Sequence, residues 1–261
     1  MLYYGNSDVG MKRQINQDSF MTIPIWGGEG LLLVVCDGMG GHKAGDIASK
    51  TAVERFTNFL FKCEPPDPES EDKTVFAFIK YQLVAACDDA NRSVFIMSEE
   101  NIDYHGMGTT LVAALIYRGC MYAINIGDSR LYKITYNRIK QVSTDHSFVQ
   151  NLIEAGKLTE EEAKTYPRRN VITKALGVVE KNDVDFFFSD LNGKGGGYLL
   201  LCTDGLTNYL DKNTIYDVVY GTEMPETETV SDLASKVNRL ISIANGSGGS
   251  DNITAVLCRF D

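Results

Sequence analysis

Five aspartates of this 261-residue chain stand next to segments that are typical of buried strands. Asp37, Asp128 and Asp204 each follow an apolar run, Asp18 follows a polar Asn-Gln pair, and Asp251 precedes an apolar run. An isolated buried carboxylate is strongly disfavoured, so an acid at such a place must be paired, hydrogen-bonded or bound to a cation. If these acids lie at one edge of a folded sheet, they have the chemistry to share metal ions.

Each of these acids also has a simpler interpretation. Asp-Gly pairs make ordinary turns, and Asp commonly caps helices. For a single site we would favour the turn, but five such sites together favour a metal centre. Carboxylate oxygens suit Mg²⁺ or Mn²⁺, whereas zinc would recruit His or Cys. The chain has only three histidines, and its six cysteines are scattered without a Cys-x-x-Cys spacing.

The composition excludes several classes of function. A formal net charge of −10 argues against a nucleic-acid-binding or anionic-membrane-binding protein, because both need a basic face. The first ten residues lack the pattern of a secretory signal, and no apolar run approaches the length of a membrane span. We therefore expect a cytoplasmic protein without a membrane partner.

The helices that must support these acids are predicted from apolar periodicity. Residues 46–61 and 74–97 each place apolar side chains on one face, and the Pro-rich segment 63–72 separates them without dividing the chain into domains. Shorter helices are predicted at residues 148–155 and 159–164, with Thr159 and Glu162 as a capping box. A last helix is predicted at residues 230–245.

Strand-like runs supply the rest of the predicted fold, at residues 31–36, 109–117, 120–126, 130–135, 138–142, 185–188, 198–203 and 252–258. Tyr136-Asn137 is a suitable two-residue hairpin turn, so antiparallel pairing is expected. Runs of strands with helices inserted in pairs indicate an α+β fold. We expect one domain over residues 1–261, with two packed sheets flanked by α-helices.

The segments that contain the acids form a series in chain order: Asp8-Val9-Gly10-x-x-Arg13-x-x-Asn16-Gln17-Asp18, Asp37-Gly38-Met39-Gly40-Gly41-His42, Gly108-Thr109-Thr110, Gly127-Asp128-Ser129-Arg130, Ser143-Thr144-Asp145-His146, Thr203-Asp204-Gly205 and Asp251-Asn252. In order, identity and spacing this series resembles the bacterial branch of the metal-dependent Ser/Thr protein phosphatases, the PPM or PP2C family. The resemblance spans nearly the whole chain.

The resemblance implies a central β-sandwich of two antiparallel sheets flanked by α-helices. It also implies a binuclear Mn²⁺ or Mg²⁺ site at one end of this sandwich, and in many members a third, weaker metal. By position, Asp37 resembles the carboxylate that bridges both metals, and the Gly38 carbonyl resembles a ligand of the second metal. The other implied metal ligands are Asp204 and Asp251 on the first metal, Asp18 through water, and Asp128 with Asp204 on the third metal.

The resemblance also implies roles in catalysis. Arg13 would bind two phosphoryl oxygens, although an arginine alone can simply form a surface salt bridge. Met39 stands where the eukaryotic branch has its acid histidine. His42 is then one candidate for the general acid, a surface or helix-start role is another, and water is an alternative acid. Gln17 stands where other members carry a Glu that helps to hold the second metal.

The implied activity is hydrolysis of phosphoserine and phosphothreonine in proteins by metal-activated water, opposing a Ser/Thr kinase of the same cell. Residues 145–177 correspond to the family's flap subdomain, where Arg168 and Arg169 could contact a phosphoprotein. A catalytically inactive phosphoprotein-binding relative, and a phosphatase acting on the regulator of an anti-sigma system, are the alternatives. A two-metal nuclease is disfavoured by the acidic charge. The expected oligomeric state is a monomer.

Overall fold

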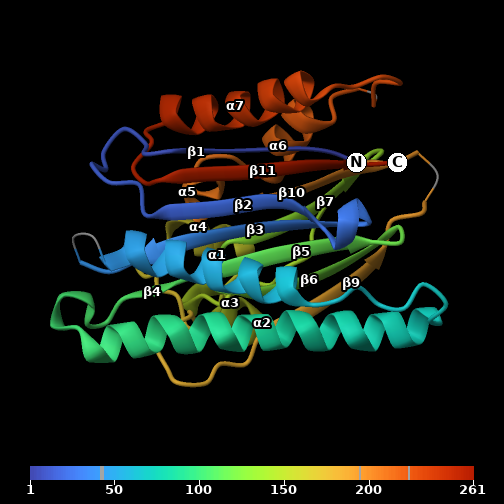
Figure 1. Cartoon of the computed structure of the whole chain (residues 1–261). Helices are drawn as coiled ribbons and strands as arrows, with labels where there is room; N and C mark the ends of the chain where they lie inside the picture. The colour runs from blue at the N-terminus through green and yellow to red at the C-terminus, as the bar shows by residue number, and fades with distance from the viewer. Residues whose placement is uncertain (42–43, 194, 223) are drawn as a thin grey trace.

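A computed structural model of the chain describes residues 1–41, 44–193, 195–222 and 224–261. Within these ranges the strands form two antiparallel sheets that pack face to face (Figure 1). The first sheet has five strands in the order β1 (Leu2–Asp8), β11 (Ile253–Phe260), β10 (Gly197–Cys202), β7 (Arg130–Thr135) and β8 (Arg138–Gln141). The predicted hairpin is confirmed, since Thr135 pairs with Arg138.

The second sheet is built around the strand that carries Asp37. Its strands follow the order β2 (Asp18–Ile25), β3 (Gly30–Met39), β5 (Leu111–Tyr117), β6 (Cys120–Ile126) and β9 (Asp185–Asp190), and the short β4 (Gly108–Thr109) also pairs with β3. Leu31, Leu33 and Val35 of β3 point between the sheets, while Leu32, Val34 and Cys36 point to the helices. Alternation along one strand therefore supplies two cores.

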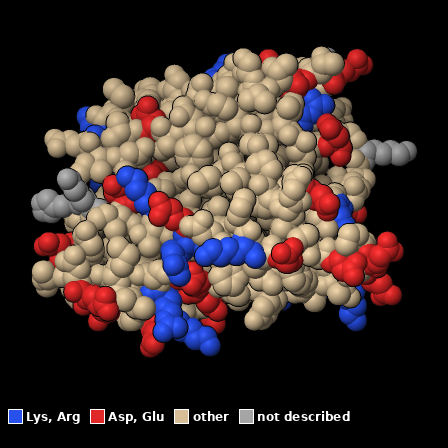
Figure 2. Space-filling view, in the orientation of Figure 1, with Lys and Arg blue, Asp and Glu red and all other residues tan. Residues whose placement is uncertain are grey.

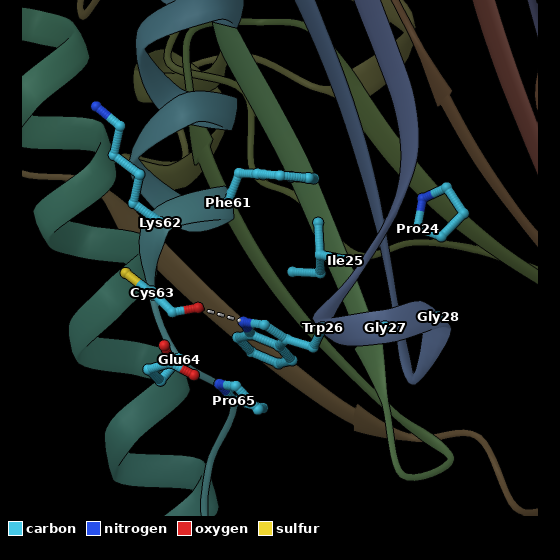
Figure 3. A pocket seen from close by; sticks show the side chains of 10 residues that line it. All are labelled: Pro24, Ile25, Trp26, Gly27, Gly28, Phe61, Lys62, Cys63, Glu64 and Pro65. Carbon is cyan, nitrogen blue, oxygen red and sulfur yellow. Dashed lines mark hydrogen bonds between the residues drawn. The ribbon is translucent and has the colours of Figure 1, made fainter.

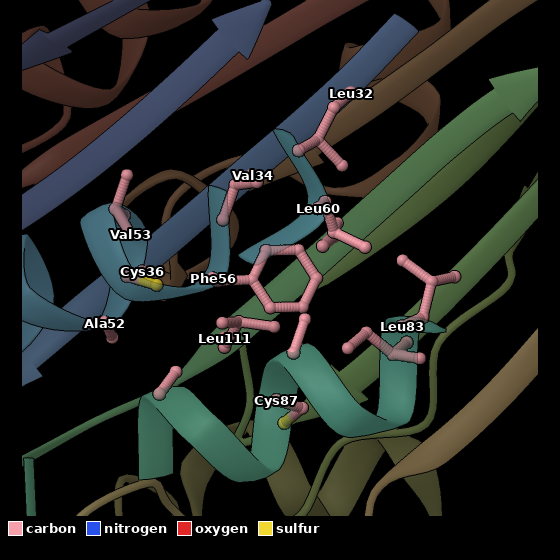
Figure 4. Close-up of a cluster of buried hydrophobic side chains, with 14 of the residues drawn as sticks. Leu32, Val34, Cys36, Ala52, Val53, Phe56, Leu60, Leu83, Cys87 and Leu111 are labelled. Atoms are coloured by element: carbon pink, nitrogen blue, oxygen red, sulfur yellow. The ribbon is translucent and has the colours of Figure 1, made fainter. Parts of the chain in front are cut away.

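Two long helices cover the outer face of the second sheet, α1 (Ala44–Lys62) and α2 (Asp72–Glu100) (Figure 1). Their apolar stripes pack on β3 and β5 around Phe56, Leu60 and Leu83, as Figure 4 shows. On the solvent side of these helices, Lys and Arg side chains lie among Asp and Glu (Figure 2), and Arg55 pairs with Asp89.

The outer face of the first sheet is covered by α6 (Lys212–Val219) and α7 (Val230–Gly246) (Figure 1). The other helical segments are α3 (Phe148–Glu154), α4 (Glu160–Thr165), α5 (Asp204–Thr207) and the 3-10 turns η1 (Trp26–Gly28) and η2 (Ile102–Tyr104). The predicted capping box of Thr159 and Glu162 is confirmed at α4. The α+β sandwich expected from the sequence is the fold observed.

In the parts of the chain that the structure describes, no helix combines the length and apolar character needed to cross a membrane. No helix or strand was predicted from the sequence at β1, β2 or α6.

Candidate active site

The five aspartates lie where strands of both sheets end, at the left-hand end of the sandwich in Figure 1. Asp18 begins β2 and stands directly opposite Asp37 of β3 in the register. Asp204 follows β10 as the first residue of α5, and Asp251 lies just before β11. Asp128 lies in the turn between β6 and β7. The fold therefore brings acids from distant parts of the sequence to one edge.

Asp18 joins the two sheets. Its Oδ2 accepts hydrogen bonds from the hydroxyl groups of Thr203, at 2.9 Å, and Thr254, at 2.6 Å, both from the other sheet. Its Oδ1 is buried without a hydrogen-bond partner, and so is the Oδ1 of Asp204. A buried carboxylate oxygen without a donor is costly, and a cation is one of the few groups that can satisfy it.

The raised pKa values of these acids also favour a bound cation. Burial raises the pKa of Asp18 to about 7. The charge of Asp204 adds to this effect, and the two threonine hydrogen bonds oppose it. Burial and the nearby charge of Asp204 raise the pKa of Asp128 to about 8. The pKa of Asp37 is raised by burial and by Asp18, and that of Asp204 by burial and by Asp251. Without a cation, this cluster repels itself.

The donors of the cluster suit a hard cation, because they are carboxylates with a backbone carbonyl beside them. Asp204 lies close enough to Asp37 for its charge to raise the pKa of Asp37. Among the described residues, however, no three Asp, Glu, His or Cys side chains converge as ready ligands of a single ion. The arrangement fits Mg²⁺ or Mn²⁺, because such ions bind carboxylate and carbonyl oxygens and keep water at their remaining positions.

The backbone of Asp37 is fixed by the Gly-Thr-Thr motif. The Thr110 hydroxyl accepts a hydrogen bond from the Asp37 amide at 2.9 Å, while the Thr109 hydroxyl and the Thr110 amide both donate to the Asp37 carbonyl at 2.9 Å. A Cβ at Gly38 would collide with the carbonyl oxygens of Gly45 and Gln17. Only glycine fits here, between β2 and the start of α1.

Arg13 lies in the loop between β1 and β2, and its Nη2 is 2.9 Å from Asp251 Oδ2. Both side chains are partly exposed, so the guanidinium is accessible next to the acids. Asn252 holds this loop in place, because its side-chain Nδ2 donates hydrogen bonds to the carbonyl oxygens of Val9 and Ile15. Its Oδ1 accepts a hydrogen bond from the Gln17 amide at 2.8 Å.

The sequence analysis assigned no role to Arg130, although it named the Gly-Asp-Ser-Arg motif. The Arg130 guanidinium forms a bidentate pair with Asp145, with Nη2 2.6 Å from Oδ2. This positive charge lowers the pKa values of Asp128 and Asp204, partly offsetting the effect of burial. Thr203 and Thr254 were likewise missed as partners of Asp18. His42, the candidate acid, lies outside the described residues.

A pocket of about 680 Å³ lies at the other end of β3, lined by residues such as Trp26, Phe61 and Pro65 (Figure 3). The Trp26 ring nitrogen donates to the Cys63 carbonyl at 3.0 Å. Of the predicted site residues that the structure describes, none lines this pocket. We therefore place the candidate active site at the aspartates, where the charged groups converge.

Comparisons with known proteins agree with this site. The family model described as Protein phosphatase 2C matches residues 11–257. The chain is 36% identical over 252 residues to the protein phosphatase PhpP of Streptococcus pneumoniae, covering 96% of this chain and 94% of that protein.

Solved structures give the same result. The crystal structure of serine/threonine phosphatase Stp1 from Staphylococcus aureus superposes with a TM-score of 0.84 at 33% identity, covering 100% of this chain and 96% of that chain. The catalytic domain of the serine/threonine protein phosphatase PstP, solved with two manganese ions, has a TM-score of 0.80 at 30% identity, covering 99% and 98%. The chain belongs to the bacterial branch of the PP2C family of serine/threonine protein phosphatases.

Proposed function

We propose that this phosphatase hydrolyses phosphoserine and phosphothreonine in proteins with two Mn²⁺ or Mg²⁺ ions, and in some states a third, held at its aspartate cluster. The observation that carries the proposal is the pair of buried, unpartnered carboxylate oxygens on Asp18 and Asp204. The manganese ions of the PstP structure support it, at 30% identity. When bound, a pair of such ions supplies an activated water nucleophile and neutralises charge on the phosphoryl group.

Under this proposal each acid has its own position. Asp37 would contribute to both ions, and the Gly38 carbonyl would bind the second. Asp204 and Asp251 would hold the first ion, Asp18 would act through water, and Asp128 would join Asp204 at the third. Fixed anionic oxygens of this kind orient the reacting groups without any reorganisation during the reaction.

Arg13 would bind the phosphoryl group. A guanidinium presents two parallel N–H donors to two phosphoryl oxygens, and this geometry stabilises the negative charge of the transition state. The present partner of Arg13 is Asp251, so an arriving phosphate would compete with a carboxylate for the same donors. The general acid that donates a proton to the leaving alkoxide would be water or His42.

The cellular setting is part of the same proposal. The chain acts as one domain and as a monomer in the cytoplasm, with residues 145–177 as the flap. Its substrates are phosphoproteins, and its activity opposes a Ser/Thr kinase of the same cell. The inactive, phosphoprotein-binding alternative is disfavoured, because the acids that such relatives would be expected to lose are present in the sequence.

The test is hydrolysis of p-nitrophenyl phosphate and of a phosphothreonine peptide by EDTA-treated protein, with Mn²⁺ or Mg²⁺ added back. We expect metal-dependent turnover that falls by about 100-fold or more in Asp37→Asn. Asp217→Asn, an exposed change on α6, is the matched control and should retain full turnover. A folded wild-type protein that is inactive with either metal would favour the binding module instead.

A further inference from the structure

Met39 and Val178 form a small apolar surface beside Asp37, here called the apolar shelf. Met39 pairs with Gly108 in the β3–β4 register. A Cβ placed on Gly108 would lie 2.9 Å from Val178 Cγ2 and 3.1 Å from Met39 Cε, so both side chains cover this glycine. Val178 is 54% exposed. The shelf is therefore open to solvent on one side.

Met39 of the shelf lies on the same strand face as Asp37, a candidate metal ligand. Side chains alternate along a strand, so Asp37 and Met39 lie on the same face of β3, about 7 Å apart. Gly108 has no side chain to separate Met39 from Val178. An extended peptide advances by about 3.3 Å per residue, and two residues therefore span the distance from Asp37 to the shelf.

The segment that carries Val178 is held in place on both sides. Leu176 and Thr109 exchange two backbone hydrogen bonds, of 2.8 and 3.0 Å. Asn91 of α2, which is only 2% exposed, accepts from the Gly177 amide at 2.8 Å and donates to the carbonyl oxygens of the two residues after Val178, at 3.1 and 2.9 Å. An exposed apolar side chain on such a fixed backbone is preorganised for binding.

We propose that the apolar shelf binds an apolar side chain of the phosphoprotein substrate, located two residues from the phosphorylated residue in an extended segment. The proposal rests on the phosphatase function proposed above. The phosphorylated residue must reach Asp37 and Arg13, so the neighbouring substrate residues lie over the surface continuous with Asp37. A leucine there buries apolar area, whereas an acidic residue would meet the repulsion of the aspartate cluster.

The test uses phosphothreonine peptides in a Gly/Ser background, with leucine or serine at the second residue before or after the phosphothreonine. For the better of the two positions, we expect kcat/KM to be about fivefold higher for leucine, since an open surface buries only part of that side chain. Val178→Ser should bring this ratio close to one. Val230→Ser is the matched control, because Val230 is 48% exposed at the start of α7 and should keep the wild-type ratio.

The outcomes separate the two proposals. Equal kcat/KM for leucine and serine peptides in an active wild-type enzyme overturns the shelf and leaves the phosphatase function standing. A leucine preference that survives in Val178→Ser overturns the shelf as well, and points to another surface. Failure of the wild-type protein to turn over p-nitrophenyl phosphate with either metal overturns the function itself.

Discussion

Arg13 is the residue for which position and chemistry give the sharpest expectation. Its pair with Asp251 is half-exposed, so the pair itself contributes little to stability. Arg13→Ala should therefore fold normally. It should lower kcat/KM for p-nitrophenyl phosphate by about 100-fold, because the negative charge on the phosphoryl oxygens in the transition state loses the guanidinium N–H donors. Inhibition by inorganic phosphate should weaken in parallel. Lys12→Ala, one residue away and exposed, is the control.

An unchanged inhibition constant for phosphate in Arg13→Ala would contradict this role.

Arg13 was recognisable from the sequence as a candidate because its motif has fixed spacing to Asp8 and Asn16. Thr203 and Thr254 were not, because their hydrogen bonds reach Asp18 from 185 and 236 residues away. A hydroxyl near an acid leaves no local pattern, and only the packing of the two sheets brings these groups together.

Among the elements, the fully buried strands were predictable, and so were the edge strands β8 and β9, whereas the edge strands β1 and β2 were not. β5 and β10 are apolar and buried at every position, which gives a clear signal. β1 and β2 each form the edge of a sheet and are half-buried for most of their length, so their side chains follow no strict alternation. Pro24 in β2 weakens the strand pattern further, although an edge strand tolerates proline.

The buried Asn91 gives a prediction at the scale of one element, since it ties α2 to the segment 177–182. Asn91→Ala leaves the Gly177 amide without its acceptor and should lower the free energy of unfolding by about 2 kcal/mol. Amide hydrogen exchange in residues 177–182 should become faster, while exchange in β5 stays slow. Arg92→Ala, an exposed neighbour on α2, should change neither. Unaltered exchange at 177–182 would rule out the anchoring role.

For the whole molecule, the aspartate cluster makes stability depend on pH. Burial raises the pKa of Asp18 from 3.8 to about 7 and that of Asp128 from 3.8 to about 8, and it also raises those of Asp37 and Asp204. Between the unfolded and folded pKa values, the folded protein binds more protons than the unfolded chain. The free energy of unfolding of the metal-free protein should therefore fall as the pH rises from about 4 to about 8.

Among the described residues, the buried imidazole of His146 acts in the opposite direction. Burial lowers the pKa of His146 from 6.5, so this imidazole favours the folded state more as the pH rises toward 6.5. Of these five described groups, the four carboxyl groups outweigh the one imidazole, and above pH 6.5 the carboxyl groups alone continue to change the stability. Bound Mn²⁺ requires the ionised carboxylates, so the stabilisation that it gives should grow over the same pH range.

Urea unfolding at about pH 5 and about pH 8, in EDTA and with added Mn²⁺, measures both effects. Asp204→Asn removes one charge from the cluster, so in EDTA its stability should fall less than that of the wild type between these two pH values. Its gain from Mn²⁺ should shrink at the same time, because a neutral amide attracts the cation less than a carboxylate does. If the EDTA-treated wild type is as stable at pH 8 as at pH 5, the pKa values of these aspartates are not raised in the folded protein, and the electrostatic case for a metal at this end of the sandwich fails.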